Sequence, residues 1–295
     1  MRSGRLEEVH PPSDLIQAWQ PILDLVGAAR DGHIEPALDG LERLLRLGDV
    51  RAAIPLAEIY AFHAEWKDCL QSAGVSLEHP EHALSLAIFP EMAELAALAA
   101  REGELWLPLD TRLHRSREVL WEWQDSAGRN QWLAILDRIQ DWSAREGAPP
   151  DPAIAPLPLY PSHPDGRNPD DAFRQTKFET RIRNTTRLRP HVMEDPVERA
   201  RTELFWAISF RLPEVAFRVA AEHPAIVAFE DTLFLAASLI ERGEPAAAWE
   251  RIAAALPRWN PADRAQVAPV ALLTHPVIRP IMTAERRAAV LARNG

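Results

Sequence analysis

The chain has 295 residues, of which 47% are hydrophobic and 26% charged, and its net charge at pH 7 is −10. This length and hydrophobic content can fill a sizeable core, which excludes a wholly disordered chain, and the single cysteine, Cys69, excludes an intramolecular disulfide and favours a reducing compartment. Residues 1–15 lack the apolar run of a signal peptide, and no apolar run approaches the roughly 20 residues that cross a bilayer, so we expect a cytoplasmic protein.

The negative charge is concentrated in the first half of the chain. Residues 1–146 hold 25 Asp and Glu against 14 Lys and Arg, whereas residues 147–295 hold 18 against 19. An acidic face attracts basic partners and repels nucleic acid, although a merely solvated surface is the simpler interpretation. Only Lys67 and Lys177 of the 33 basic residues are lysine, a bias typical of GC-rich bacterial genomes. Arginine content alone therefore does not indicate phosphate recognition.

Helical periodicity dominates the sequence. Apolar or small residues recur at intervals of three and four in three segments, and each stripe is expected to face a core. The stripes are Ala53, Ile54, Ala57, Tyr60, Ala61 and Ala64; Trp132, Leu133, Ile135, Leu136, Ile139 and Trp142; and Val197, Ala200, Leu204, Ala207 and Ile208. Strand patterns are sparse, so the sequence predicts an all-α fold, and short turns between the helices predict antiparallel helical hairpins.

Prolines mark expected helix starts, where a fixed φ and a missing N–H are tolerated. The prolines that open apolar-periodic segments are Pro80, Pro196, Pro213, Pro224, Pro245, Pro261 and Pro276. Asp195 precedes Pro196 as a candidate N-cap, with Glu198 in the capping-box position. Pro55 and Pro90 interrupt their patterns, and we expect each to shorten or kink a helix.

Residues 147–169 divide the chain. Eight prolines in this segment exclude a regular helix and favour an extended, polyproline-like crossing, either free or strapped across a helical surface. We therefore expect three parts: an acidic helical lobe over residues 1–146, the proline-rich crossing and a basic strip over 147–195, and a second helical lobe over 196–295.

The basic strip, residues 173–191, is the first candidate binding site. Its basic side chains are Arg174, Lys177, Arg181, Arg183, Arg187 and Arg189, against one acidic residue, Glu179. Alternation from Phe178 through Ile182 and the following Asn184 allow a short β-hairpin with the arginines on one face. Such a strip can hold a phosphate or an acidic partner. The favoured alternative is an internal clamp, in which Arg181 and Arg183 pair with carboxylates of the acidic lobe.

Tryptophans provide the second candidate. Five of the ten lie between positions 106 and 142. Trp121 and Trp123 are two residues apart and cannot both face the core from one helix. One of them is therefore expected on a recognition surface.

No motif for catalysis, metal binding or cofactor binding is present in the sequence. His79 and His82 are separated by Pro80 and lack further ligands, so no metal site is expected. Glycine-rich phosphate loops and a nucleophile elbow are missing, and Cys69 stands in an apolar context that would raise its pKa. The sequence therefore predicts neither an enzyme nor a cofactor.

Gly32, Gly48, Ala64 and Pro80 fall at intervals of 16 at expected turns, about half of the 34-residue helix–turn–helix unit of tetratricopeptide repeats. Two stretches resemble that repeat at its small and apolar positions: Leu56, Ala57, Tyr60, Cys69, Ala73 and Ser76; and Leu235, Ala236, Leu239, Gly243, Ala248, Ile252, Ala255 and Pro261. The repeat's aromatic residue in the second helix is replaced by Ala73 and Ile252. The resemblance implies a TPR-like α-solenoid that binds protein segments and carries no catalytic residues.

Residues 161–294 are also similar to uncharacterised actinobacterial proteins suspected to act as immunity or accessory partners of toxins. This similarity implies a non-enzymatic protein–protein interaction module, an immunity protein that neutralises a cognate toxin with a basic surface. The alternative function is binding of a nucleotide or phosphorylated metabolite, or an enzyme, built on the basic strip. Neither a membrane nor nucleic acid is expected as a partner.

Overall fold

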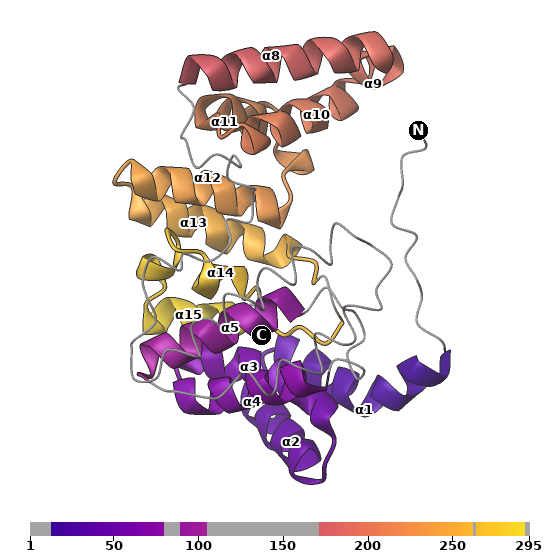
Figure 1. Ribbon diagram of the computed structural model, residues 1–295, viewed down its shortest axis with the longest axis vertical. Coiled ribbons are helices and arrows are strands. Elements are labelled where there is room, and N and C mark those ends of the chain that lie inside the picture. The colour runs from indigo at the N-terminus through magenta and orange to yellow at the C-terminus, as the bar shows by residue number, and fades with distance from the viewer. Residues whose placement is uncertain (1–12, 80–88, 105–170, 262–263, 293–295) are drawn as a thin grey trace. The chain divides into compact units, whose positions relative to one another are not determined.

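The computed structural model describes residues 13–79, 89–104, 171–261 and 264–292 (Figure 1). All regular secondary structure in these ranges is helical, which confirms the all-α fold class. None of the helices in them is long and apolar enough to span a membrane. Several expectations lie outside the described residues: the crossing at 147–169, the tryptophan stripe from Trp132, the starting proline Pro80, His82, and the candidates Trp121 and Trp123.

The chain forms two compact units. The first unit comprises Met1–Ile154, Pro261–Thr274 and Met282–Gly295, and the second comprises Ala155–Asn260 and His275–Ile281. The chain therefore returns to the first unit after Asn260. This grouping differs from the three consecutive parts expected from the sequence, in which all residues after 195 formed one lobe.

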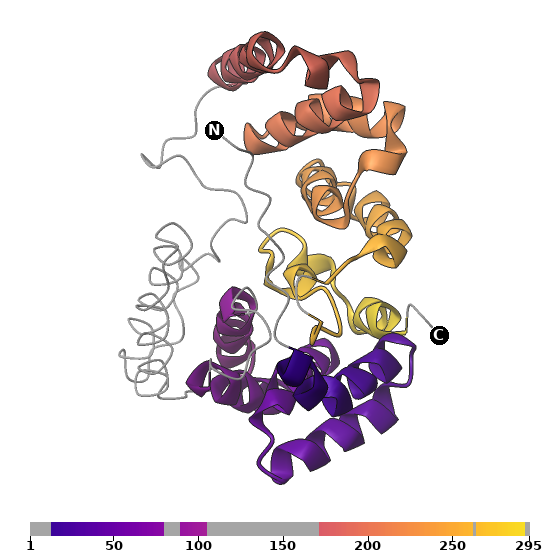
Figure 2. The ribbon, with the colours of Figure 1, turned by 90° about the vertical axis from the view of Figure 1, so that its right-hand side faces the viewer.

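Between residues 13 and 78 the first unit consists of four helices joined by short turns, and three further helices belong to its described part. Its elements are α1 (Ser13–Arg30), α2 (Ile34–Arg46), the 3₁₀ turn η1 (Val50–Ala52), α3 (Ala53–His63), α4 (Trp66–Glu78), α5 (Phe89–Glu102), α14 (Ala271–Thr274) and α15 (Ala284–Leu291). Along the chain, α1 packs on α2, α3 on α4, and α4 on α5 (Figure 2). The late helices join them, because α15 packs on α3 and α14 on α5.

Residues with left-handed backbone conformation follow the first three helices of this unit at the expected positions. Gly32 and Gly48 have φ angles of 86° and 90° and stand two residues after the ends of α1 and α2, while Ala64, with a φ of 63°, directly follows α3. Glycine adopts this conformation without a steric penalty, which explains two of the three positions. The 16-residue spacing therefore identified the turns correctly, apart from Pro80, which lies outside the described residues.

Helix α3 is enclosed on all sides. Every residue from 53 to 62 is buried, because α2, α4, α5 and α15 all pack on this helix. The expected single apolar stripe was therefore too narrow, since it omitted Leu56, Glu58 and Ile59, which are fully buried. A helix that is apolar around its whole circumference is typical of the centre of a core. Here α3 also brings one carboxyl group, that of Glu58, into the core.

The positions of the prolines agree with the helix starts in part. Among the predicted helix-opening residues, Pro196, Pro213 and Pro245 occupy the first turn of a helix, and Pro224 opens a 3₁₀ turn. Two predictions were wrong, because Pro261 lies outside any helix and Pro276 lies in a turn.

Pro55 and Pro90 are also close to helix starts. They stand third in α3 and second in α5. Pro55 follows the 3₁₀ turn η1 by three residues, where the chain changes from 3₁₀ to α-helical geometry, and the kink or shortening expected at each proline stays a prediction.

The second unit contains the helices after residue 170. Its elements are α8 (Asp171–Leu188), α9 (Pro190–Glu194), α10 (Pro196–Ser209), α11 (Pro213–Glu222), η4 (Pro224–Ile226), α12 (Phe229–Glu241), α13 (Pro245–Ala255), η5 (Leu256–Arg258) and η6 (Arg279–Ile281). The strongest pairings are α10 with α11 and α12 with α13, while α8 packs on α9 and α10 (Figure 1).

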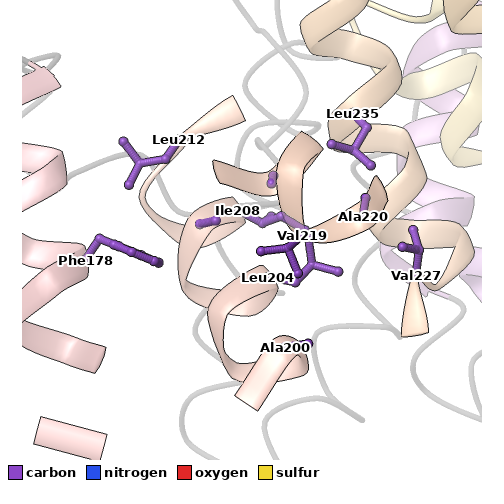
Figure 3. Packing of buried hydrophobic residues seen from close by; sticks show 11 residues of the cluster. Phe178, Ala200, Leu204, Ile208, Leu212, Val219, Ala220, Val227 and Leu235 are labelled. Carbon is purple, nitrogen blue, oxygen red and sulfur yellow. The ribbon is translucent and has the colours of Figure 1, made fainter. Parts of the chain in front are cut away.

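A cluster of apolar side chains joins α8, α10, α11 and α12 (Figure 3). Its buried members are Phe178 from α8; Ala200, Leu204, Ala207 and Ile208 from α10; Leu212, Ala216, Val219 and Ala220 in and beside α11; and Val227 and Leu235. The predicted stripe of α10 is confirmed by four of its members. Val197 is an exception, since 44% of its surface is exposed at the first turn of the helix.

The expected β-hairpin over residues 178–188 is wrong, because these residues belong to α8. Helical spacing places Phe178 and Ile182 one turn apart on the side that packs on the cluster. The threonines that favoured a strand satisfy their hydroxyls within the helix: Thr180 donates to the Thr176 carbonyl at 2.8 Å, and Thr186 to the Ile182 carbonyl at 2.9 Å. The hydroxyl groups therefore have partners within the helix, so these threonines do not require a strand.

Candidate binding groove

A groove runs between α8, α9 and α10 in the second unit. It has a volume of about 460 Å³, and its walls carry apolar, aromatic and arginine side chains. The lining residues are Arg181, Asn184, Thr185, Leu188, Arg189, Val192, Arg201, Thr202, Phe205 and Trp206. We call it the α8–α10 groove.

The α10 wall is positioned by a well-defined helix start. Asp195 caps α10 by accepting hydrogen bonds from the backbone N–H groups of Val197 at 2.8 Å and Glu198 at 3.4 Å, and Pro196 occupies the first turn. The same helix buries Leu204 in the core. With that residue facing inward, the helical period turns the next side chain, Phe205, toward solvent.

Two aromatic rings and a guanidinium group of the groove lining contact one another. Trp206 contacts Phe205 edge to face, with ring centroids 4.9 Å apart, and stacks on Phe210 at 5.7 Å. The Cζ atom of Arg181 lies 5.1 Å from the centre of the Trp206 ring. This cation–π contact orients the Arg181 side chain without neutralising its charge.

Two apolar side chains of the groove are unusually open to solvent. Leu188 is 76% exposed and Phe205 is 59% exposed. Such side chains contribute nothing to the core of the unit, and a partner that covered them would gain hydrophobic free energy.

Four arginines at and after the C-terminal half of α8 lack carboxylate partners within the described part of the chain. Arg183, Arg187 and Arg189 are exposed and form no ion pair there, and Arg181 has only its contact with Trp206. Arg201 is different, because its guanidinium lies 2.6 Å from the Glu198 carboxylate. Unpaired guanidinium groups beside exposed apolar side chains favour a ligand that carries both carboxylates and apolar groups.

The groove contains part of the predicted site. Arg181 and Arg189 line it, whereas Arg174, Lys177, Arg183 and Arg187 lie on α8 outside its lining. Pairing of Arg181 and Arg183 with the acidic lobe stays a prediction.

Sequence reasoning missed Arg201, Phe205 and Trp206. The sequence did contain a signal for them, because two aromatic residues directly follow the core residue Leu204. Neighbouring helical positions cannot all face inward, so at least one of these aromatic side chains had to be exposed.

A buried polar cluster in the first unit holds the returning segment. The Glu58 carboxylate on α3 is fully buried and accepts hydrogen bonds from the backbone N–H groups of Val267 and Ala268, the latter at 3.1 Å. Burial raises the pKa of Glu58, and the Glu91 carboxylate raises it further. Gln266 donates a hydrogen bond to Glu91. These contacts fix a backbone segment, so we interpret the cluster as structural.

Arg30 completes this attachment from α1. Its Nε donates to the Gln266 carbonyl at 2.8 Å, and its Nη2 donates to the Arg264 carbonyl at 3.0 Å. Its positive charge lowers the pKa of Glu58, although burial has the larger effect. A guanidinium group can bind several carbonyls at once, which suits it to hold a chain segment without secondary structure.

Cys69 is a core residue, as expected. Burial raises the pKa of its thiol to about 12, so the thiolate that a nucleophile requires is scarce at neutral pH. Within the described residues, no cluster of three or more His, Cys, Asp or Glu is arranged to hold a metal ion.

Comparison with protein-family models, with curated proteins and with solved structures finds no match to this chain. The fold therefore defines the class, an all-helical protein within the described residues, and the α8–α10 groove supplies the basis for a functional proposal.

Proposed function

We propose that this chain is a non-enzymatic protein-binding module whose α8–α10 groove takes an acidic segment of a partner protein. The observation that carries the proposal is the combination of exposed apolar side chains, Leu188 and Phe205, with the guanidinium groups of Arg181 and Arg189 on one surface. Arginine and aromatic residues are enriched among the residues that dominate binding free energy in protein interfaces.

Charge favours an acidic segment over a basic one at this place. Residues 173–191 hold six basic side chains and only Glu179 as an acid, although the whole chain has a net charge of −10. A carboxylate can accept two parallel hydrogen bonds from one guanidinium group, which adds geometric specificity to the attraction. A partner with a basic surface would instead suit the first unit, where Asp31, Glu35 and Asp39 are exposed.

Affinity capture with charge-reversal variants tests the proposal. The wild-type chain, bound to a resin and exposed to a lysate of the source cells, should retain a stoichiometric protein partner. The double variant Arg181→Glu, Arg189→Glu should lose it, because the groove then repels carboxylates. A control variant, Arg43→Glu with Arg46→Glu on α2, reverses the same charge on the first unit and should retain the partner. Equal retention by both double variants would refute the proposed site.

The alternative ligand is a nucleotide or phosphorylated metabolite. Arg181, Arg189 and the exposed ring of Phe205 favour it, since guanidinium groups can bind a phosphate and an exposed aromatic ring can stack on a base. A ligand present at about 100 times its Kd should stabilise the chain by about 2.7 kcal/mol and raise Tm accordingly. Unchanged melting across a broad panel of nucleotides and sugar phosphates would eliminate this alternative.

The finer proposal names a toxin as the partner and rests on the resemblance stated above. The test starts with identification of the genes that neighbour the gene of this chain. If that gene encodes a toxin, co-expression of this chain should restore growth, and toxicity unaffected by co-expression would count against an immunity role.

A further inference from the structure

We propose that a second cavity, between α11, α12 and α13, binds a small organic oxyanion, a carboxylate or phosphate carried on an apolar body. The cavity lies within the second unit and has a volume of about 600 Å³. The lining residues are Phe217, Ala220, Pro224, Val227, Thr232, Leu239, Ala247, Glu250, Arg251, Ala254 and Arg258. It shares no residue with the α8–α10 groove, so the inference does not depend on the proposed function.

Two arginines of α13 and its C-terminal extension provide the anion-binding groups. Arg251 is partly buried and forms no hydrogen bond or ion pair within the described residues, while Arg258 donates to the Pro224 carbonyl at 3.2 Å. Burial lowers the pKa of Arg251, and the positive charge of Arg258 lowers it further. Two neighbouring cations that repel each other in a partly desolvated site would be stabilised by one bound oxyanion.

The only carboxylate on the lining does not neutralise these cations. Glu250 is exposed and forms no ion pair with Arg251 or Arg258. Thr232 donates its hydroxyl to the Ala228 carbonyl at 3.0 Å, so that proton is already used. Recognition of the anion therefore depends on the two guanidinium groups.

The remaining walls suit an apolar body. Val227 is buried, Leu239 is partly buried, and both line the cavity together with the ring of Phe217. The Arg251 guanidinium lies 5.4 Å from the centre of the Phe217 ring, which places a cation beside an aromatic surface. A ligand with an anionic head and an apolar body would match both features.

Arg242 provides a matched control. Its guanidinium lies over the same Phe217 ring at 4.9 Å, but it is paired with Glu214 at 2.6 Å and does not line the cavity. Replacing Arg242 therefore removes a cation near Phe217 without removing one from the cavity.

Isothermal titration calorimetry with phenyl phosphate, benzoate and inorganic phosphate tests the site. We expect saturable binding of phenyl phosphate or benzoate, whichever head group the site prefers. Inorganic phosphate should bind at least about tenfold more weakly, because it lacks the apolar body. Arg251→Gln should weaken binding of the preferred probe by about tenfold or more, whereas Arg242→Gln should leave it unchanged. Arg258→Gln, on the exposed side of the cavity, provides a second lining variant if Arg251→Gln fails to fold.

Three results would overturn the inference. The first is no binding of any probe to the wild-type chain at roughly 10 mM. The second is equal affinity of a folded lining variant and the wild type. The third is inorganic phosphate binding as tightly as the preferred probe, because the apolar body would then contribute nothing to binding.

Discussion

Replacing Glu58 by glutamine should remove a pH dependence from the stability of the first unit. Burial raises the pKa of this carboxyl well above its ordinary value of 4.5, and the neighbouring Glu91 carboxylate raises it further. The hydrogen bonds from Val267 and Ala268 and the charge of Arg30 lower the pKa without outweighing burial. The folded chain therefore keeps a proton on Glu58 at pH values where the unfolded chain has released it.

Proton linkage gives the magnitude. Between pH 4.5 and the raised pKa, the folded state holds one more proton at Glu58 than the unfolded state, so the free energy of unfolding should fall by about 1.4 kcal/mol per pH unit. The stabilisation is complete below pH 4.5 and is lost as the pH rises through the folded-state pKa. Glutamine keeps an oxygen for the two backbone donors but binds no proton in this range. Glu58→Gln should therefore gain stability relative to the wild type as the pH rises.

Urea unfolding between about pH 5 and pH 8, followed by circular dichroism, measures the difference. All other titrating groups are common to both proteins, so the difference in unfolding free energy isolates Glu58. Glu91→Gln is the second variant: it removes a charge that raises the Glu58 pKa, so the decline in stability should end at a lower pH. If the difference in unfolding free energy between wild type and Glu58→Gln stays constant across this pH range, the reasoning is refuted.

Three further predictions concern the second unit. Phe178→Ala, which removes the main anchor of α8, should lower the free energy of unfolding by about 3 kcal/mol in urea, whereas Thr180→Ala on the exposed face should change it by less than about 1 kcal/mol. Gly243→Ala should cost about 1 kcal/mol and lower Tm, because φ is 81° there while an added Cβ meets nothing within 4 Å. The free energy of unfolding of the double variant Arg181→Ala, Arg183→Ala should lie within about 1 kcal/mol of the wild-type value, while the variant no longer binds the partner. A decrease of about 1 to 5 kcal/mol in the free energy of unfolding would instead support the internal clamp.

Local signals in the sequence were sufficient for the fold class and for many helix ends. The stripe from Ala200 to Ile208 follows the helical period because one side of α10 is buried, and Pro196 opens that helix because its first N–H needs no acceptor. The turns at Gly32 and Gly48 were predictable because few residues other than glycine adopt positive φ without strain. Each of these features depends on residues that are neighbours in the chain.

The hairpin failed for a local reason as well. The alternation around Thr180 matched a strand, but the spacing from Phe178 to Ile182 also matched one helical turn, and burial against α10 decided between the two patterns. The attachment of the returning segment could not be predicted from the sequence in this way. Glu58 and Val267 are 209 positions apart, and neither stands in a motif that marks it for the other.

The arginines illustrate why residue type alone did not locate the proposed binding groove. Arg30 and Arg287 use their guanidinium groups to hold backbone carbonyls, the latter donating to Phe62 at 3.1 Å, and such arginines stabilise the fold. Arg181 lies against an aromatic ring and keeps its charge available, while Arg189 has no carboxylate partner in the described residues. The sequence presents all four as the same residue in a chain rich in arginine. Burial and partners separate them, so a search for binding arginines in such chains should begin with the guanidinium groups that the fold leaves unpaired.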